Sequence, residues 1–157
     1  MPASYPVSES ATLAVPPDVA YDALLAAPLE EILGFRTGLI PAITGCSGQD
    51  GPWGTVGQTR VIETSDGGQL LETLVHAQRP TDYRYRISEV RGPMRLVVSG
   101  IDGRFAFEAA GAGTRVTWSW DLHPTSVVTR LGMPVFAFFW HRSARKMFDR
   151  LTDRVTA

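Results

Sequence analysis

Two stretches near the end of the chain decide the fold: residues 114–122 read TRVTWSWDL and residues 135–155 read VFAFFWHRSARKMFDRLTDRV. In the first stretch apolar and polar side chains alternate, which is typical of a strand with one buried face. In the second, apolar side chains recur at helical spacing. That stripe consists of Phe136, Trp140, Ala144, Met147, Phe148, Leu151 and Val155. We therefore predict a long amphipathic helix, ~33 Å from Pro134 onward at ~1.5 Å per residue, that covers one face of a sheet.

The rest of the chain predicts six further strands and two short helices. The strands are expected at residues 7–15, 41–47, 58–64, 69–78, 83–90 and 95–109. Gly100 and Gly103 interrupt the last of these, where we expect a bulge. Proline fits the first turn of a helix, so Pro17 and Pro28 indicate where the short helices begin. Successive hairpins give a seven-stranded antiparallel sheet, and the strand, helix, helix, six strands, helix order predicts an α+β fold.

The sequence allows two interpretations of where the long helix begins. Gly132-Met133-Pro134 either begins it or kinks a longer helix that starts near Ser126, because proline lacks the amide proton that continues a helix. Phe138 and Phe139 point away from the stripe of Trp140 and Leu151, so the first turns are apolar nearly all round. Packing under the glycine-rich loop 48–57, lining the mouth of a cavity, or a contact in a homodimer would each explain this.

Composition limits the class of protein. Of the 157 residues, 44% are hydrophobic and 20% charged, with a net charge of −1, which excludes a disordered chain and argues against a nucleic-acid binder. The longest apolar run, residues 133–140, is far shorter than the ~20 residues of a membrane span. The N-terminus shows no basic leader, so we expect a cytoplasmic protein with one domain over residues 1–157 and disorder at residues 1–5.

Several phrases, in order along the chain, resemble one family. They are VPPDV at 15–19, IPAI at 40–43, VGQTR at 56–60, Glu72, YRYRI at 83–87 and GTRVTW at 113–118. Together they are similar to the polyketide cyclase/dehydrase and lipid-transport branch of the START-like (SRPBCC, Bet v 1-like) superfamily. The resemblance implies a helix-grip fold, in which a curved sheet wraps around the C-terminal helix. It also implies a cavity between them for a hydrophobic or amphipathic small molecule, and it leaves the reaction open.

Strand alternation assigns side chains to the inner face, and the resemblance places Glu72 there. A tight turn near Gly67 would bring Arg60 opposite Glu72, so we expect a buried hydrogen-bonded ion pair. This pair either fixes the hairpin register or anchors a polar atom of a ligand. We expect the cavity to be lined by Arg60, Ile62, Thr64, Leu70, Glu72, Leu74, His76, Tyr83, Tyr85, Ile87, Phe105, Phe107, Trp118, Trp120, Phe136, Trp140, Ser143 and Met147.

Three residues are candidates for catalysis. Arg60 and Tyr85 would polarise a carbonyl group, and His76 would act as a general acid or base if it faces the cavity. A lone histidine on an apolar strand is more often a core residue than a catalytic one, and ordinary core packing is the alternative interpretation of the aromatic side chains. The three histidines lack metal-ligand spacing, so we expect neither a metal nor a cofactor. We interpret the loop 48–57, which carries Trp53, as a mobile lip of the cavity.

Three functions remain open from the sequence. The leading hypothesis is a protein that sequesters or carries a hydrophobic or amphipathic small molecule. The second is an enzyme similar to polyketide aromatase/cyclases or dehydratases. The third is a protein-interaction module that uses the surface around Phe138 and Phe139.

Overall fold

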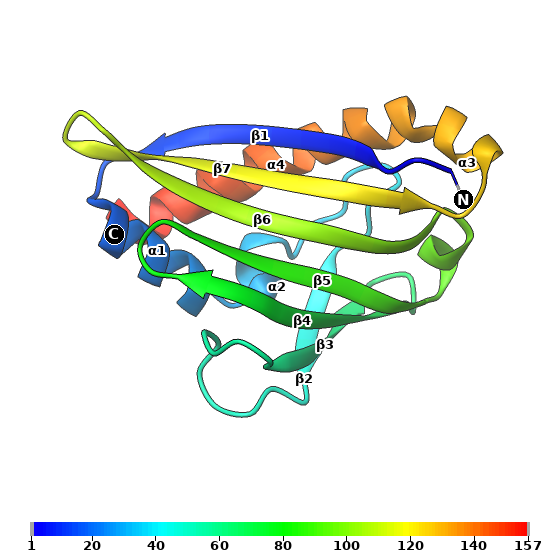
Figure 1. Ribbon diagram of the computed structural model, residues 1–157, viewed down its shortest axis with the longest axis horizontal. Helices are drawn as coiled ribbons and strands as arrows, with labels where there is room; N and C mark the ends of the chain where they lie inside the picture. Colours follow the sequence, from blue (N-terminus) through cyan, green and yellow to red (C-terminus); the bar gives the residue numbers. More distant parts are fainter. Residues whose placement is uncertain (1, 157) are drawn as a thin grey trace.

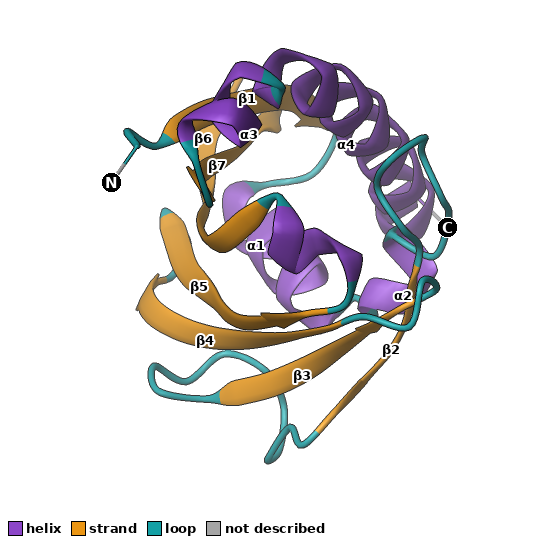
Figure 2. Cartoon of the chain, turned by 90° about the vertical axis from the view of Figure 1, so that its right-hand side faces the viewer, coloured by secondary structure: helices purple, strands orange, loops and turns teal. Residues whose placement is uncertain are grey.

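A computed structural model describes residues 2–156, whose strands form one antiparallel sheet (Figure 1). Its order is β1-β7-β6-β5-β4-β3-β2. The strands are β1 (Tyr5–Leu13), β2 (Ile43–Ser47), β3 (Thr59–Thr64), β4 (Gln69–Gln78), β5 (Asp82–Arg91), β6 (Val98–Ala110) and β7 (Gly113–Pro124). The predicted seven-stranded antiparallel sheet is therefore confirmed. Seen from one end, the sheet is strongly curved (Figure 2).

The helices lie on the concave side of this sheet or at its ends. They are α1 (Pro17–Ala26), α2 (Leu29–Ile32), a 3-10 helix η1 (Pro93–Leu96), α3 (Val127–Leu131) and α4 (Met133–Thr156). Figure 2 shows α4 running along the open side of the curve. No helix among residues 2–156 is long and apolar enough to cross a membrane.

The predicted apolar stripe of α4 is buried against the sheet. Phe136, Trp140, Ala144, Met147, Phe148 and Leu151 belong to the hydrophobic core, whereas Val155, the last residue of the predicted stripe, is half-buried outside it. Burial of such side chains stabilises by about 1.5–3 kcal/mol each, which is what holds this helix across the sheet. The long helix predicted over residues 135–155 is confirmed.

The alternative of one kinked helix is wrong, because α3 and α4 are separate elements. Ser126 caps α3: its hydroxyl oxygen accepts a hydrogen bond from the Thr129 amide at 3.1 Å, and the Thr129 side chain bonds back to the Ser126 amide. Gly132 ends α3, and α4 begins at Met133. Pro134 then lies in the first turn of α4, where amide groups have no partner within the helix, so the missing amide proton of proline costs no hydrogen bond.

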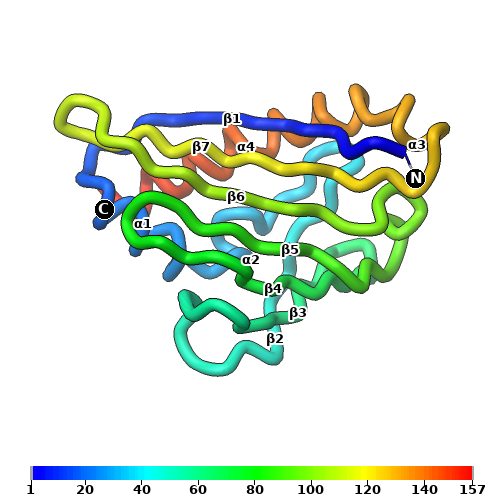
Figure 3. Tube along the Cα trace, viewed as in Figure 1, coloured from blue at the N-terminus to red at the C-terminus, as the bar shows by residue number. Residues whose placement is uncertain are grey.

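Most strand boundaries differ from the expected ones by one or two residues, and larger differences occur at the start of β6 and at the N-terminus. Residues 93–96 form η1 instead of the start of a strand, so β6 begins at Val98, and the expected bulge lies between Val98 and Gly100. At the N-terminus, β1 already begins at Tyr5, within the segment for which disorder is expected. The Arg130 side chain donates a hydrogen bond to the Ala3 carbonyl at 3.1 Å, so the start of the chain lies beside α3 (Figure 3).

Phe138 and Phe139 have different surroundings. A Cβ added at Gly38 would lie 2.3 Å from the Phe139 ring, so this ring packs directly on the segment between α2 and β2, not under the loop 48–57. Gly38 also has a positive φ of 56°, a conformation that glycine adopts without strain. Phe138, by contrast, is 56% exposed.

Candidate ligand-binding cavity

A cavity lies between the concave face of the sheet, α4 and the α1–α2 segment. Its volume is about 100 Å³. Most of the predicted lining residues contribute to its wall: Arg60, Ile62, Thr64, Leu70, Glu72, Tyr83, Tyr85, Ile87, Phe105, Trp118, Trp120, Trp140, Ser143 and Met147. The wall is predominantly apolar and aromatic, with a few polar groups facing inward.

Four predicted lining residues lie elsewhere. Leu74, Phe107 and Phe136 are buried in the core but do not reach the cavity. For these three the predicted inward direction is right and the expected contact with the cavity is wrong, because other side chains fill the space around them. The fourth, His76, faces the other way.

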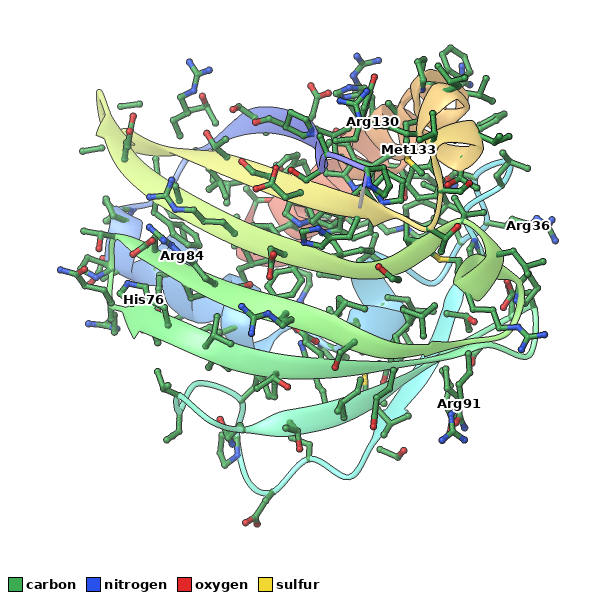
Figure 4. All side chains as sticks on the ribbon, turned by 45° about the vertical axis from the view of Figure 1, so that its right-hand side comes forward. Arg36, His76, Arg84, Arg91, Arg130 and Met133 are labelled. Carbon is green, nitrogen blue, oxygen red and sulfur yellow. The ribbon has the colours of Figure 1, made fainter. Side chains whose placement is uncertain are left out.

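His76 lies on the outer face of the sheet because β4 is bulged. Leu74 pairs with Tyr85, and His76 pairs with Arg84, the residue next to Tyr85. Val75 is therefore an extra residue in β4, and beyond it each side chain points to the opposite face from the one that strict alternation predicts. The His76 imidazole lies 3.2 Å from the Asp82 carboxylate, which also accepts a hydrogen bond from Arg104. Figure 4 shows His76 and Arg84 at the same end of the sheet. The hypothesis that His76 acts on a cavity guest is therefore wrong.

Sequence reasoning missed one side of the wall. It is supplied by residues of α1, α2 and the segment that follows, together with η1 and the start of β6: Leu24, Leu29, Ile32, Leu33, Ile40, Pro41, Ile43, Met94 and Ile101. Short helices have little periodicity from which to assign a buried face. The apolar positions of residues 24–33 were the available signal, and Figure 2 shows α1 and α2 enclosed by the sheet and α4.

Arg60 and Glu72 form the predicted buried ion pair. They face each other in the β3–β4 register, and the Arg60 Nε donates to Glu72 Oε1 at 2.8 Å. Arg60 is 7% exposed and Glu72 4%. Burial raises the pKa of Glu72, and the Arg60 charge opposes that rise. The pairing and its position on the inner face are confirmed.

The loop 48–57 packs onto this ion pair. The Arg60 guanidinium lies over the Trp53 ring, 4.0 Å from its centroid, as in a cation–π contact. The Gln58 side chain organises the loop: its oxygen accepts hydrogen bonds from the Gly54 and Thr55 amides, and its nitrogen donates to the Asp50 and Pro52 carbonyls. These bonds, together with Trp53, hold the loop against β3.

Tyr85 reaches across a whole strand to the tryptophans of β7. Its hydroxyl oxygen accepts a hydrogen bond from the Trp118 indole at 2.8 Å and another from the Trp120 indole at 2.6 Å. Gly103 of the intervening β6 makes this possible, because a Cβ there would lie 2.1 Å from the Tyr85 ring. Gly103 is therefore required by the crossing ring, and the predicted bulge at this residue is wrong, since it keeps regular pairing with Trp120.

The other potentially reactive groups lie outside the cavity or are chemically unreactive. Burial raises the pKa of the Cys46 thiol to about 11, so it is protonated at neutral pH and a poor nucleophile. Within residues 2–156 no three His, Cys, Asp or Glu side chains are grouped so as to hold a metal ion.

A curved seven-stranded sheet closed by a long C-terminal helix over an apolar cavity defines the Bet v 1-like class of helix-grip proteins. Within that class, the family described as polyketide cyclase/dehydrase and lipid transport matches residues 6–156. The chain belongs to this family. No curated protein matches it.

Solved structures share the fold at low sequence identity. Ara h 8.0201 is 19% identical with a TM-score of 0.65, and 98% of each chain is covered. Norcoclaurine synthase from Thalictrum flavum, in complex with dopamine and hydroxybenzaldehyde, is 14% identical with a TM-score of 0.71, over 98% of this chain and 87% of the synthase. Major latex-like protein 151 from Panax ginseng is 17% identical with a TM-score of 0.58, over 92% and 99% of the two chains. These likenesses show the fold alone.

Proposed function

We propose that this protein binds a small hydrophobic or amphipathic molecule in the cavity under α4. The observation that carries the proposal is the cavity wall itself, which is apolar and aromatic but includes the Arg60–Glu72 pair and the Tyr85 hydroxyl. Ligand pockets typically combine an apolar lining with a few convergent polar groups that orient the guest. Membership of a family that includes lipid transport supports the same reading.

We propose that the guest is about the size of a single aromatic ring. The cavity measures about 100 Å³, the same order as the ~150 Å³ of an engineered apolar cavity that binds benzene. The synthase with the same fold was solved with two single-ring aromatic compounds, which supports guests of this scale.

We favour binding over catalysis as the main activity. The enzyme hypothesis needs a proton-transfer group beside the guest, and His76, its candidate base, lies on the outer face of the sheet. Burial raises the pKa of Tyr85, so its hydroxyl keeps its proton at neutral pH. The Glu72 carboxylate is already paired with Arg60. Arg60 and Tyr85 then serve to orient a polar atom of the guest.

Filling the cavity tests this proposal. Ser143 is a buried residue of α4 in the cavity wall, so Ser143→Leu puts a larger apolar side chain into the space the guest would use. We expect Ser143→Leu to weaken binding of toluene about tenfold, since overpacking costs about 1–3 kcal/mol and 1.4 kcal/mol is tenfold in affinity. Calorimetric titration measures the change, and native mass spectrometry of the purified protein looks for a co-purifying guest.

The matched control is Ser143→Ala, which removes the same hydroxyl without filling space and should bind toluene like the original protein. Equal toluene affinity in Ser143→Leu and Ser143→Ala would contradict a guest site in this cavity. Native protein that takes up neither toluene nor any co-purified molecule would contradict the proposed function.

We also propose that α3 and the first turns of α4 form a contact between two copies of the chain. Large apolar side chains gather there and are open to solvent: Val127, Val128, Leu131, Val135 and Phe138. Leu131, for example, is 76% exposed. Monomeric soluble proteins rarely expose contiguous apolar patches of this kind, and a net charge of −1 gives two copies little mutual repulsion.

Light scattering is expected to give twice the chain mass of 17.1 kDa. The Leu131→Asp variant should then elute as a monomer, because a charge in an apolar contact is costly to desolvate. Val56→Asp, at an equally apolar exposed residue in the loop 48–57, should leave the dimer intact. A native protein that is monomeric at every concentration would overturn the proposed dimer.

A further inference from the structure

A second hollow lies outside the cavity, between the α1–α2 segment and the loop 48–57. We call it the outer groove, and its volume is about 580 Å³. Apolar side chains of the α1–α2 segment, Leu25, Ala26 and Pro28 among them, form one wall. Within residues 2–156, Leu29 and Arg60 are the two residues that line both the outer groove and the cavity. Arg60 therefore stands between two separate hollows.

The two ends of the Arg60 guanidinium face different hollows. Its Nε donates to Glu72, which lines the cavity and not the outer groove. Its Nη1 lies 3.5 Å from the Gln49 side-chain oxygen, and Gln49 lines the outer groove and not the cavity. The Trp53 ring, also in the groove wall, covers one flat side of the guanidinium at 4.0 Å. The edge that carries Nη1 and Nη2 is thus directed toward the outer groove.

Most N–H groups of Arg60 lack a good acceptor. A guanidinium has five of them, and the bond to Glu72 uses one. The contact with Gln49 is longer than the usual 2.7–3.2 Å, and Nη2 has no partner in the described part of the chain. Unpartnered side-chain nitrogens that solvent cannot reach belong there to Trp53 and Trp140, so Nη2 of Arg60 stays accessible although the residue is only 7% exposed. A buried donor without a partner is destabilising, so an acceptor belongs at this edge.

The charges of the groove wall limit what that acceptor can be. Arg60 is its single cation among residues 2–156, and Asp22 and Glu30 are its acids. Asp22 is already neutralised, because both of its carboxylate oxygens accept 2.8 Å hydrogen bonds from Arg79. Glu30 is exposed. A guest with one negative charge can pair with Arg60, whereas a second negative charge would lie against the apolar wall or beside these acids.

We propose that the outer groove binds a small aliphatic monocarboxylate, whose two oxygens accept hydrogen bonds from Nη1 and Nη2 of Arg60. The planar fork of a guanidinium matches a carboxylate in this way, and such charge-assisted bonds are among the strongest hydrogen bonds in proteins. The carboxylate replaces the long contact with Gln49, while the Nε bond to Glu72 remains. The alkyl chain lies along the apolar wall formed by Leu25, Ala26 and Pro28. This site is separate from the cavity and goes beyond the function proposed above.

The test compares hexanoate with hexanamide, which has the same shape but no charge. Calorimetric titration at neutral pH is expected to show about tenfold tighter binding of hexanoate, since hydrogen bonds between charged groups are about twice as strong as neutral ones. Hexanedioate, with a carboxylate at each end, should bind about tenfold more weakly than hexanoate.

A groove-filling variant tests the place of binding. Ala26 is exposed at the end of α1, so Ala26→Phe fills the outer groove without disturbing the core. It is expected to weaken hexanoate binding about tenfold. The matched control is Ala112→Phe, the same change in the exposed turn between β6 and β7, which lines neither hollow and should leave the affinity unchanged.

The native protein provides a second readout through its tryptophans. In ¹H–¹⁵N spectra hexanoate is expected to shift the indole signal of Trp53, which packs on Arg60. The signals of Trp118, Trp120 and Trp140, which line the cavity, should move much less. An excess of toluene, the probe for the cavity, should leave the affinity for hexanoate unchanged.

Equal affinities for hexanoate and hexanamide would overturn carboxylate recognition. Displacement of hexanoate by toluene, or an unchanged affinity in Ala26→Phe, would overturn its location in the outer groove. A native protein that binds hexanoate with these properties but takes up no toluene would contradict the cavity function and leave the carboxylate site standing.

Discussion

The Arg60→Leu variant is expected to lose about 3–5 kcal/mol of its free energy of unfolding, because Glu72 would then be a buried carboxylate without its cation. The 2.8 Å bond between the two side chains is the only charged contact of Glu72 within residues 2–156, and the residue is almost fully buried. Urea unfolding at neutral pH measures the loss. Leucine keeps the apolar bulk of the arginine stem, so the change reports mainly on the charge.

Two further variants show whether the missing partner is the cause. Arg60→Leu/Glu72→Leu removes both charges and is expected to recover most of the lost stability, since apolar replacements of buried ion pairs are often neutral. Arg79→Leu breaks an ion pair at the surface, with Asp22, and should change stability little. A double variant as unstable as Arg60→Leu alone would show that the arginine matters for its packing under Trp53 instead.

The pH dependence of unfolding provides a separate signature. Burial raises the pKa of Glu72, so the folded state holds this proton more tightly than the unfolded chain does. Its contribution to stability is therefore full below the unfolded pKa of about 4.5 and is lost as the pH rises through the higher folded pKa. Because Arg60 opposes the rise, Arg60→Leu should show a steeper loss with pH. Adding Glu72→Gln to that variant should remove the extra slope.

Gly103→Ala is expected to lower the free energy of unfolding by about 1–3 kcal/mol, the usual cost of overpacking a filled interior. The new Cβ would lie 2.1 Å from the Tyr85 ring, so the ring must leave its place across β6. Both indole hydrogen bonds to the Tyr85 hydroxyl then break, and the Trp118 and Trp120 indole signals should shift in ¹H–¹⁵N spectra. Chemical unfolding and these spectra together measure the effect.

Gly45→Ala is the matched control, because a Cβ at this residue of β2 meets no atom within 4 Å. It should be close to neutral. If the clash with Tyr85 is the cause, Gly103→Ala should cost much less in a Tyr85→Ala background, as a double-mutant cycle would show. Equal costs in the two backgrounds would mean that Gly103 is needed for backbone reasons, and not for the tyrosine.

The fold could be predicted from the sequence because apolar and polar side chains alternate along most of the strands and one helix carries a continuous apolar stripe. The Arg60–Glu72 pair was predictable for the same reason, since a short turn near Gly67 fixes which residues of β3 and β4 face each other. Tyr83, Tyr85, Phe105 and Trp118 followed from the same period of two. These features depend on neighbouring residues or on adjacent strands.

The features that the sequence did not reveal depend on single irregularities or on distant contacts. One extra residue at Val75 reverses the alternation of β4 and moves His76 to the outer face, and no residue type there signals a bulge. Gly103 looks like a strand breaker until the crossing of Tyr85 is known. The Trp140 indole nitrogen, buried without a hydrogen-bond partner among the described residues, depends on the contact between α4 and β7, which no local pattern encodes.

The three clustered indole rings give the protein an intrinsic circular dichroism signal that can report on ligand binding. The rings of Trp118, Trp120 and Trp140 lie 5.0 to 5.7 Å apart, close enough for their electronic transitions to couple. Such coupling produces a circular dichroism band whose sign and strength depend on the mutual orientation of the rings. Entry of a molecule beside them would change that band, so occupancy could be followed in unlabelled protein without any added dye.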